Sequence, residues 1–303
     1  YLDSEKILFK IFLLTRNSEN VRKFAYNYKN LDIVPILGSL PFQEKDFIKE
    51  LPKVDFILHM ASVTAEESFN KIDPLEKYLL LNQGTLDICN YGLHINAKRL
   101  LFTSSGCVYG VNNKKPINEN NSLKVSGDSV INNSLAIGKI SAEYTCNYFN
   151  EFKSLDTKIA RCFSFCGLGM PTNLHYAIGN FSSQAIKGDK IIINGDGLAV
   201  RSYMDLDDLA IWLARLLFFD SNFNVYNFGS QEEISIISLA KLIKKISNSA
   251  SEICVLNKNN VTLSNPERDY YVPNISRAIK DLSLSLKFNL ECSISKYIKS
   301  LKE

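Results

Sequence analysis

Several polar residues of this chain directly follow or close apolar runs, where a folded protein would present them to a ligand. Arg16 follows the run 11–15, and Ser104 and Ser105 close the run 99–105. In open α/β sheets, ligands bind outside the carboxyl ends of the strands. A guanidinium can donate two parallel hydrogen bonds to phosphate oxygens, and a serine hydroxyl both donates and accepts. These residues therefore indicate a site at the strand ends, and a small anionic ligand would suit it.

The elements that must position these residues alternate along the first half of the chain. Apolar runs predict strands, and amphipathic segments with caps predict helices. The predicted order is strand 11–15, helix 18–28, strand 32–37, a short helix at 45–51, strand 54–62, helix 74–93, strand 99–105, helix 134–152 and strand 157–165. This alternation predicts an α/β fold with a doubly wound parallel sheet of the Rossmann type.

Beyond residue 166 the alternation gives way to short strands, turns and helices. Such a change predicts a smaller α+β domain that is interleaved with the sheet. We expect a dinucleotide-binding domain formed by residues 1–165 plus about 203–229. A substrate-binding domain is expected from about 166–202 plus 230–303.

A dinucleotide site of this architecture needs a glycine-rich turn after its first strand, so that backbone N–H groups can approach a pyrophosphate. The first glycine of the chain is Gly38, and the side chains of residues 15–19 would obstruct such an approach after the run 11–15. We therefore interpret 11–15 as the second strand. The first strand and its glycine loop are expected to be absent, so that the recorded sequence would be incomplete.

In this interpretation Arg16 lies where a residue reads the adenosine ribose. An acidic residue at this place suits the free 2′-hydroxyl of NAD, whereas an arginine suits the 2′-phosphate of NADP. Arg16 therefore slightly favours NADP over NAD. A solvated arginine at the start of a helix is an equally good interpretation.

Composition argues against several classes of protein. The 303 residues are 46% hydrophobic and can bury a large core. The net charge of +3 comes from 35 basic and 32 acidic residues without a basic block, so no nucleic-acid partner is expected. No apolar run approaches the roughly 20 residues of a membrane helix. Seven cysteines without a CxxC pair indicate a reducing compartment, so we expect a cytoplasmic protein. The three histidines are scattered along the chain, which argues against a metal site.

Several segments, in order, carry a family resemblance. The most specific are LLFTSSGCVYG at 100–110 and SLAIGKISAE at 134–143. Weaker matches are HMAS (59–62), NQGT (82–85), RCFSFCGLG (161–169), INGDGLAVRSYMDLDDLA (193–210), VYNFGS (225–230) and NPERDYYVPNISRA (265–278). In these segments the chain resembles the extended short-chain dehydrogenases/reductases of the NAD-dependent epimerase/dehydratase family. The resemblance implies hydride transfer between a nicotinamide cofactor and a nucleoside-diphosphate sugar.

The resemblance implies catalytic roles for Ser105, which would hydrogen-bond the reacting sugar oxygen, and for Lys139, which would bind the nicotinamide ribose. One helical turn before this lysine, the family carries a tyrosine that moves a proton. Here that residue is Leu135, which has no titratable proton. Tyr144 lies on roughly the opposite helix face and is a poor substitute. An inactive variant, a different acid and a homologue retained for binding are all open.

The remaining implied contacts concern the cofactor and the substrate. Cofactor-binding residues are expected at Arg16, Ser39, Leu40, Ala61, Ser62, Lys139 and Phe163. Substrate-binding residues are expected at Ser104, Asn180, Arg201 and Arg268, and the two arginines would neutralise the diphosphate. Arg161 is expected either near the sugar nucleotide or in a structural ion pair.

The expected reaction is epimerisation or 4-keto reduction at C4 of a nucleoside-diphosphate hexose, with NAD or NADP. Dehydration is disfavoured, because dehydratases of the family carry an acidic pair where this chain has Gly106 and Cys107. Leu135 favours the alternative, a catalytically silent protein that binds a sugar nucleotide or dinucleotide. Apolar positions in the helices at 75–93 and 140–152 allow a homodimer.

Overall fold

The computed structural model describes residues 9–25, 31–44, 46–63, 66–67, 72–110, 116–125, 127, 129–174, 176–256 and 270–303. The elements of the first half are β1 (Phe9–Thr15), α1 (Ser18–Ala25), β2 (Leu31–Leu37), α2 (Phe47–Glu50), β3 (Phe56–His59), α4 (Pro74–His94), β4 (Arg99–Ser105), the 3-10 helix η1 (Gly106–Tyr109), α5 (Val130–Phe152) and β5 (Thr157–Cys162). The second half contains β6 (Phe165–Cys166), α6 (Ala177–Lys187), β7 (Ile191–Ile193), β8 (Val200–Arg201), β9 (Met204–Asp205), α7 (Leu206–Phe218), β10 (Val225–Phe228), β11 (Ile234–Ser235), α8 (Ile236–Ser247), β12 (Ile253–Val255), β13 (Tyr270–Tyr271), α9 (Ser276–Asp281) and α10 (Leu290–Lys302).

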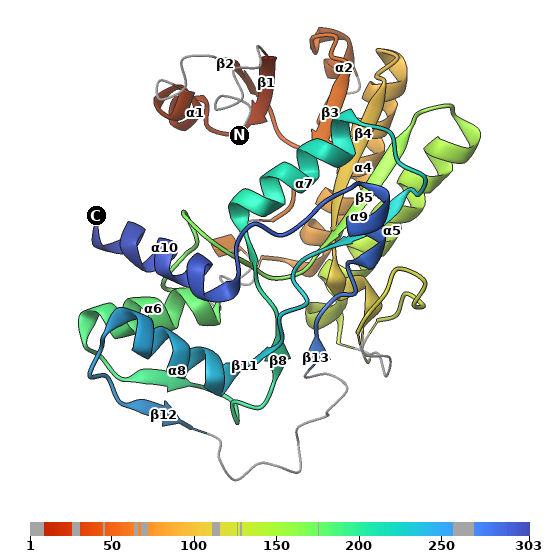
Figure 1. Ribbon diagram of the computed structural model, residues 1–303. Helices are drawn as coiled ribbons and strands as arrows, with labels where there is room; N and C mark the ends of the chain where they lie inside the picture. Colours follow the sequence, from red (N-terminus) through yellow and green to blue (C-terminus); the bar gives the residue numbers. More distant parts are fainter. Residues whose placement is uncertain are drawn as a thin grey trace.

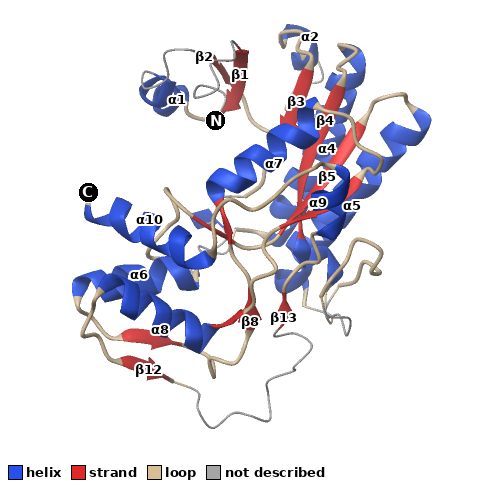
Figure 2. Cartoon of the chain, in the orientation of Figure 1, coloured by secondary structure: helices blue, strands red, loops and turns tan. Residues whose placement is uncertain are grey.

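Four parallel strands in the order β10-β5-β4-β3 form the central sheet (Figure 1). Helices cover both of its faces (Figure 2). Leu100 and Phe102 of β4 are buried with residues of α4 and α5, whereas Leu101 is buried with residues of α7. A strand that is buried on both faces has a continuous apolar sequence, which is why β4 could be predicted with its observed bounds. The expected doubly wound α/β architecture is confirmed.

The parallel sheet is in two parts. Strands β1 and β2 pair only with each other among the described residues, and Figure 1 shows them apart from the central sheet. Strand β3 is consequently an edge strand, and Leu58 on it is 41% exposed. The common strand order of a Rossmann sheet is 3-2-1-4-5-6. If β1 of this chain corresponds to the second strand of that order and β3 to the fourth, the break falls at the place of the first strand. The break therefore agrees with the interpretation of 11–15 as the second strand.

The second lobe contains short strands and three helices, α6, α8 and α10, around a separate apolar core (Figure 1). Phe181, Leu239 and Tyr297 are buried in this core. Ile275 and Leu282, by contrast, pack with Trp212 in the core of the central sheet. Part of the segment assigned to the substrate-binding domain thus belongs to the first lobe by packing, and the remaining domain boundaries stay a prediction.

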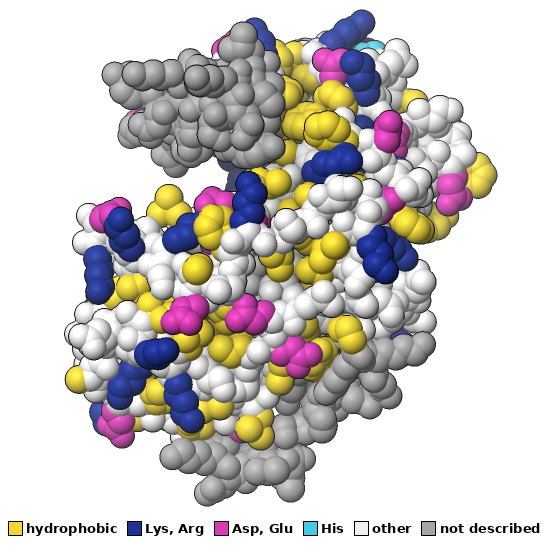
Figure 3. All heavy atoms as spheres, viewed as in Figure 1, with side chains coloured by type: hydrophobic (Ala, Val, Ile, Leu, Met, Phe, Trp, Pro, Cys, Tyr) yellow, Lys and Arg dark blue, Asp and Glu magenta, His cyan; other side chains and the backbone are white. Residues whose placement is uncertain are grey.

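The surface is mixed in charge. Basic and acidic side chains are interspersed among apolar ones on the face drawn in Figure 3. No helix in the described ranges is long and apolar enough to cross a membrane. The same ranges contain no group of three or more histidine, cysteine, aspartate or glutamate residues that could hold a metal ion.

Candidate active site

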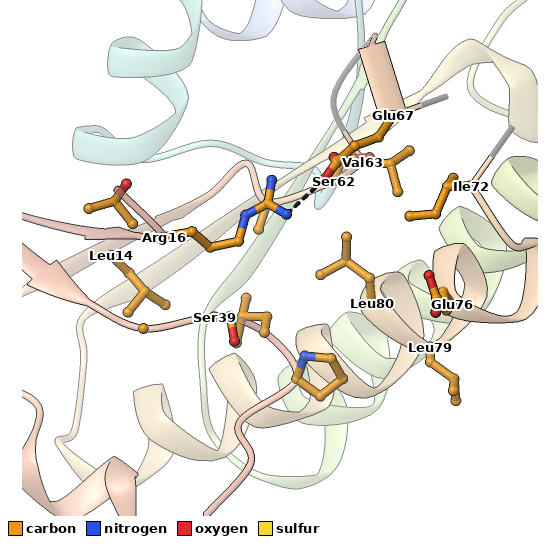
Figure 4. A pocket seen from close by; sticks show the side chains of 15 residues that line it. Leu14, Arg16, Ser39, Ser62, Val63, Glu67, Ile72, Glu76, Leu79 and Leu80 are labelled. Carbon is orange, nitrogen blue, oxygen red and sulfur yellow. Dashed lines mark hydrogen bonds and ion pairs between the residues drawn. The ribbon is translucent and has the colours of Figure 1, made fainter. Parts of the chain in front are cut away.

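One pocket gathers five of the residues that were expected to bind the cofactor. It has a volume of about 490 Å³ and lies at the carboxyl ends of β1, β2 and β3, beside the first half of α4 (Figure 4). Its lining includes Arg16, Ser39, Leu40, Ala61 and Ser62. Parallel strands present their carboxyl ends at one edge of a sheet, so segments far apart in the sequence converge here.

Arg16 forms an ion pair in this pocket. Arg16 and Glu67 point toward one another, and Nη1 of the arginine lies 2.7 Å from Oε1 of the glutamate (Figure 4). The hydrogen bond and charge of Glu67 raise the pKa of Arg16. Leu14, Val63 and Leu80 supply apolar lining, which fits an adenine ring beside a ribose. The glycine-rich turn that would hold a pyrophosphate is not among the described residues.

The second part of the site lies at the end of β4. Ser105 caps the short helix η1, because its hydroxyl oxygen accepts a hydrogen bond of 3.2 Å from the backbone N–H of Cys107. The hydroxyl proton is not used by this capping contact and can be donated elsewhere. Ser105 is partly exposed, as a residue that orients a ligand must be.

Lys139 of α5 is held against the same strand. Its Nζ donates a 2.6 Å hydrogen bond to the backbone oxygen of Thr103 and lies 4.6 Å from the ring centroid of Phe102. Burial lowers the pKa of Lys139 to about 8. Burial, together with the charge of this lysine, also lowers the pKa of the neighbouring His59 to about 3, so this histidine is neutral at physiological pH. The two residues implied as catalytic, Ser105 and Lys139, are therefore brought to one strand end.

Leu135 lies one helical turn before Lys139 on α5 and is partly buried. Residues separated by four positions share a helix face, so Leu135 occupies the place expected for a proton-transferring tyrosine. Tyr144 on the same helix is 74% exposed, which agrees with the expectation that it cannot replace that tyrosine.

Ser104 faces the other side of β4. It is 3% exposed, and its hydroxyl donates a 2.5 Å hydrogen bond to Oε1 of Glu143. Successive residues of a strand point to opposite faces, so Ser104 and Ser105 cannot both face the ligand. This geometry argues against the expected substrate contact of Ser104, and we assign it a structural contact instead.

Arg161 also belongs to the buried framework. Its guanidinium forms a bidentate pair with Glu143, with Nη2 2.7 Å from Oε2 and Nε 3.0 Å from Oε1. Its Nη1 donates to the hydroxyl of Tyr109 at 2.9 Å, and that hydroxyl donates to Oδ1 of Asn227 at 2.6 Å. Burial raises the pKa of Tyr109 to about 12, so it remains a phenol. Of the two expectations for Arg161, the structural ion pair is the one observed.

Phe163 and Tyr271 line the site from the other side. Phe163 is buried, and its ring centroid lies 4.6 Å from that of Tyr271 on β13. The phenol oxygen of Tyr271 lies beside Gly106, the residue after Ser105, and burial raises the pKa of Tyr271. Tyr271 lies in the matching segment 265–278, for which only Arg268 was expected to contact a ligand.

The expected substrate residues lie in the second lobe. Asn180 on α6 donates a 2.5 Å hydrogen bond to the backbone oxygen of Leu174. Arg201 on β8 is partly buried, and its guanidinium lies 6.0 Å from the ring centroid of Tyr271. Arg268 lies outside the described residues. The contacts of Asn180, Arg201 and Arg268 with a substrate stay predictions.

A parallel α/β sheet with a pocket at the carboxyl ends of its strands, and with a serine and a lysine at the end of β4, is typical of nicotinamide-dependent enzymes. The model of the NAD dependent epimerase/dehydratase family matches residues 15–229. The chain belongs to this family.

Known proteins are similar to this chain in sequence and in structure. UDP-glucuronic acid decarboxylase 1 of Xenopus tropicalis is 28% identical over 211 residues, which are 68% of this chain and 48% of the relative. The chain thus spans about half the length of this relative. UDP-glucuronic acid decarboxylase 3 of Arabidopsis thaliana is 27% identical over 79% of this chain and 68% of its own length.

Among solved structures, the UDP-N-acetylglucosamine 4-epimerase of Methanobrevibacter ruminantium, in complex with UDP-N-acetylmuramic acid, superimposes with a TM-score of 0.83. It is 21% identical, and the match covers 99% of this chain and 93% of that one. The dTDP-glucose 4,6-dehydratase of Bacillus anthracis, in complex with NAD, gives a TM-score of 0.79 at 19% identity, over 100% of this chain and 91% of that one. These similarities confirm the expected fold.

We predict that Glu143→Gln strongly destabilises the protein, because it leaves the buried guanidinium of Arg161 without its counter-charge. The expected loss in the free energy of unfolding is about 3–5 kcal/mol, measured by urea denaturation. Asp55→Asn is the matched control, since its pair with Lys98 has both side chains 68% exposed, and should cost less than about 1 kcal/mol. Equal effects of the two substitutions would contradict this prediction.

Proposed function

We propose that this protein acts at C4 of a UDP-hexose, as an epimerase or a 4-keto-reductase, with NAD as hydride carrier. The main support for this proposal is the hydrogen bond of 2.6 Å from Nζ of Lys139 to the backbone oxygen of Thr103. It holds Lys139 at the end of the strand that carries Ser105, two residues further on. The similarity to UDP-sugar epimerases supports the choice of a UDP-sugar and of C4. The glycine and cysteine at positions 106 and 107 make a dehydratase a poorer choice.

Each group of residues has one task in this proposal. Bound NAD would supply the hydride acceptor or donor for C4 of the sugar. The hydroxyl of Ser105 orients the C4 oxygen, and Lys139 holds the nicotinamide ribose, with Phe163 beside the site. Arg201 and Arg268 neutralise the diphosphate, and Asn180 contacts the nucleotide. The pocket formed by Arg16, Ser39, Leu40, Ala61 and Ser62 holds the adenosine half of the cofactor.

The preference for NAD over NADP follows from the Arg16–Glu67 ion pair. The carboxylate of Glu67 already supplies the anion that a 2′-phosphate would offer to Arg16. A 2′-phosphate would have to displace this carboxylate or tolerate its repulsion. The free 2′-hydroxyl of NAD is uncharged, so it neither displaces the Glu67 carboxylate nor is repelled by it. Arg16 alone slightly favoured NADP, whereas the ion pair of Arg16 with Glu67 favours NAD.

We predict that Glu67→Gln increases the affinity for NADPH about tenfold and changes the affinity for NADH less than twofold, because it removes a negative charge beside the ribose site. Fluorescence titration of the full chain with both cofactors measures this. Glu76→Gln is the matched control, since Glu76 lines the same pocket away from Arg16. Unchanged NADPH affinity in Glu67→Gln would show that this carboxylate does not select the cofactor.

Leu135 supports one alternative, a catalytically silent protein that binds the same ligands. The two functions differ in turnover by the unmodified chain. The assay panel consists of UDP-glucose, UDP-N-acetylglucosamine and UDP-glucuronic acid with NAD, and UDP-4-keto-6-deoxyglucose with NADH, with products separated by chromatography.

We predict measurable turnover of at least one substrate of this panel by the unmodified chain. Leu135→Tyr should raise it at least tenfold, because it places a phenol one turn from Lys139. Leu135→Phe is the control, since it adds the ring without the hydroxyl. Turnover that exists only in Leu135→Tyr would favour the silent binder, and binding without turnover in both would contradict action at C4.

We also propose that the protein forms a homodimer through α4 and α5. Leu75 and Leu79 on α4, and Ile137, Tyr144 and Phe152 on α5, are exposed apolar residues at helical spacing. Exposed large apolar side chains on neighbouring helices are typical of an interface between protein chains.

We predict that Tyr144→Glu converts the dimer into a monomer, because it buries a charge in the interface. Sedimentation velocity measures the change, and the fold is expected to survive since Tyr144 is 74% exposed within one chain. Ile192→Glu on β7 is the control, because this residue is exposed away from α4 and α5. A dimer that persists in Tyr144→Glu would place the interface elsewhere.

A further inference from the structure

Tyr271 enters the candidate site from the second lobe. Its strand β13 pairs in parallel with β8, and this pairing sets Tyr271 opposite Arg201. Its ring packs on Phe163, and its hydroxyl lies against Gly106, the residue that follows Ser105 at the end of β4. One aromatic side chain thus connects the strand end of the first lobe with the arginine of the second.

Tyr271 lies between two residues that have proposed roles in binding the substrate. Ser105 is the residue proposed to orient the reacting C4 oxygen, and Arg201 is the residue proposed to neutralise the diphosphate. In a nucleoside-diphosphate hexose the sugar ring lies between these two chemical groups. A side chain that spans from Ser105 to Arg201 therefore lies along the sugar.

Gly106 makes room for the phenol. A Cβ atom at this position would lie 2.6 Å from the Tyr271 hydroxyl oxygen and 2.8 Å from the ring of Phe163. Real Cβ atoms essentially never approach so closely, so any larger residue would displace one of the two rings. The loss of a side chain beside Ser105 and the presence of the phenol are thus coupled in this chain.

We propose that Tyr271 is the proton donor of this site and delivers its phenol proton to the C4 oxygen of the sugar, the task that Leu135 cannot perform. This inference rests on the proposed function. It also selects the direction, since a proton donor serves the reduction of a 4-keto sugar.

The proton balance of the step is simple. The reduced cofactor, when bound, supplies the hydride to C4. The O–H bond of Tyr271 breaks as a new O–H bond forms on the C4 oxygen, which completes the alcohol. The phenolate that is left regains a proton from solvent water. Burial raises the pKa of Tyr271, so the residue begins each cycle as a phenol, and phenols are effective general acids when held against the reacting oxygen.

Two other groups near Ser105 are poorer donors. Lys139 uses Nζ to bind the backbone oxygen of Thr103 and lies over the ring of Phe102. Cys107 bonds Ser105 through its backbone N–H, and burial raises the pKa of its thiol. A thiol is a weaker hydrogen-bond donor than a phenol.

The test is Tyr271→Phe, which keeps the ring and removes the hydroxyl. With UDP-4-keto-6-deoxyglucose and NADH, turnover followed at 340 nm should fall about 100-fold. By calorimetry, the affinity for UDP-glucose should fall about 3- to 10-fold because one hydrogen bond to the sugar is lost, and the affinity for UDP should stay within twofold. Tyr270→Phe is the matched control, since its neighbouring hydroxyl bonds Glu233 instead.

Rescue separates a proton donor from a merely structural residue. In the double variant Tyr271→Phe with Leu135→Tyr, turnover should recover at least tenfold, because the new phenol lies beside Lys139. Turnover of Tyr271→Phe within threefold of the unmodified chain would overturn the proposal. Tighter binding of UDP-glucose by Tyr271→Ala would also overturn the proposal, since the side chain of Tyr271 would then fill the sugar site. Turnover that appears only with Leu135→Tyr would overturn it as well. Failure of the unmodified chain to bind UDP and NADH would instead overturn the proposed function itself.

Discussion

The candidate site depends on the buried ion pair between Arg161 and Glu143. The pair joins β5 to α5, and hydrogen bonds from Ser104 and to Tyr109 extend it to β4 and η1. Burying two charges costs several kcal/mol per ion unless their geometry and hydrogen bonds are good, and a bidentate guanidinium meets that condition. An alternative register of α5 on the sheet would leave a buried charge unpaired. The pair therefore specifies one position for the helix.

That single position determines the chemistry. Lys139 precedes Glu143 by one helical turn, and Ser105 follows Ser104 on β4. Once Glu143 is fixed beneath the strand by Ser104, Lys139 is fixed at the strand end and Ser105 faces the opposite side. The buried contact of Ser104 with Glu143 thus lies on one face of β4, and the side chain of Ser105 lies on the other.

This arrangement explains which features could be predicted from sequence. Buried parallel strands have continuous apolar sequences, so β4 was predicted with its observed bounds and β5 with its observed start. Motifs that are local in sequence, such as 100–110 and 134–143, placed Ser105 and Lys139. The break between β1 and β3 agrees with the interpretation of 11–15 as the second strand, which rested on the missing glycine-rich turn and not on periodicity. The resemblance implied a substrate contact for Ser104, and the observed contact of its hydroxyl is with the buried Glu143. Glu67 lies in no matching segment, and Tyr271 lies in the matching segment 265–278, in which only Arg268 was expected to bind a ligand.

Because Leu135 stands in place of the expected tyrosine, the proton for the C4 oxygen must come from another residue. A carbonyl at C4 that receives a hydride must also receive a proton, and the donor has to be within hydrogen-bonding distance of that oxygen. Serine is too weak an acid to be the ultimate donor, and Leu135 supplies none. The absence of a side chain at Gly106 leaves a space beside Ser105 that the hydroxyl of Tyr271 enters. Since Tyr271 belongs to β13 and pairs with the strand of Arg201, the donor reaches Ser105 only when the second lobe is packed against the first. Proton transfer in this chain therefore depends on the contact between the two lobes, whereas a tyrosine on α5 would depend on the first lobe alone.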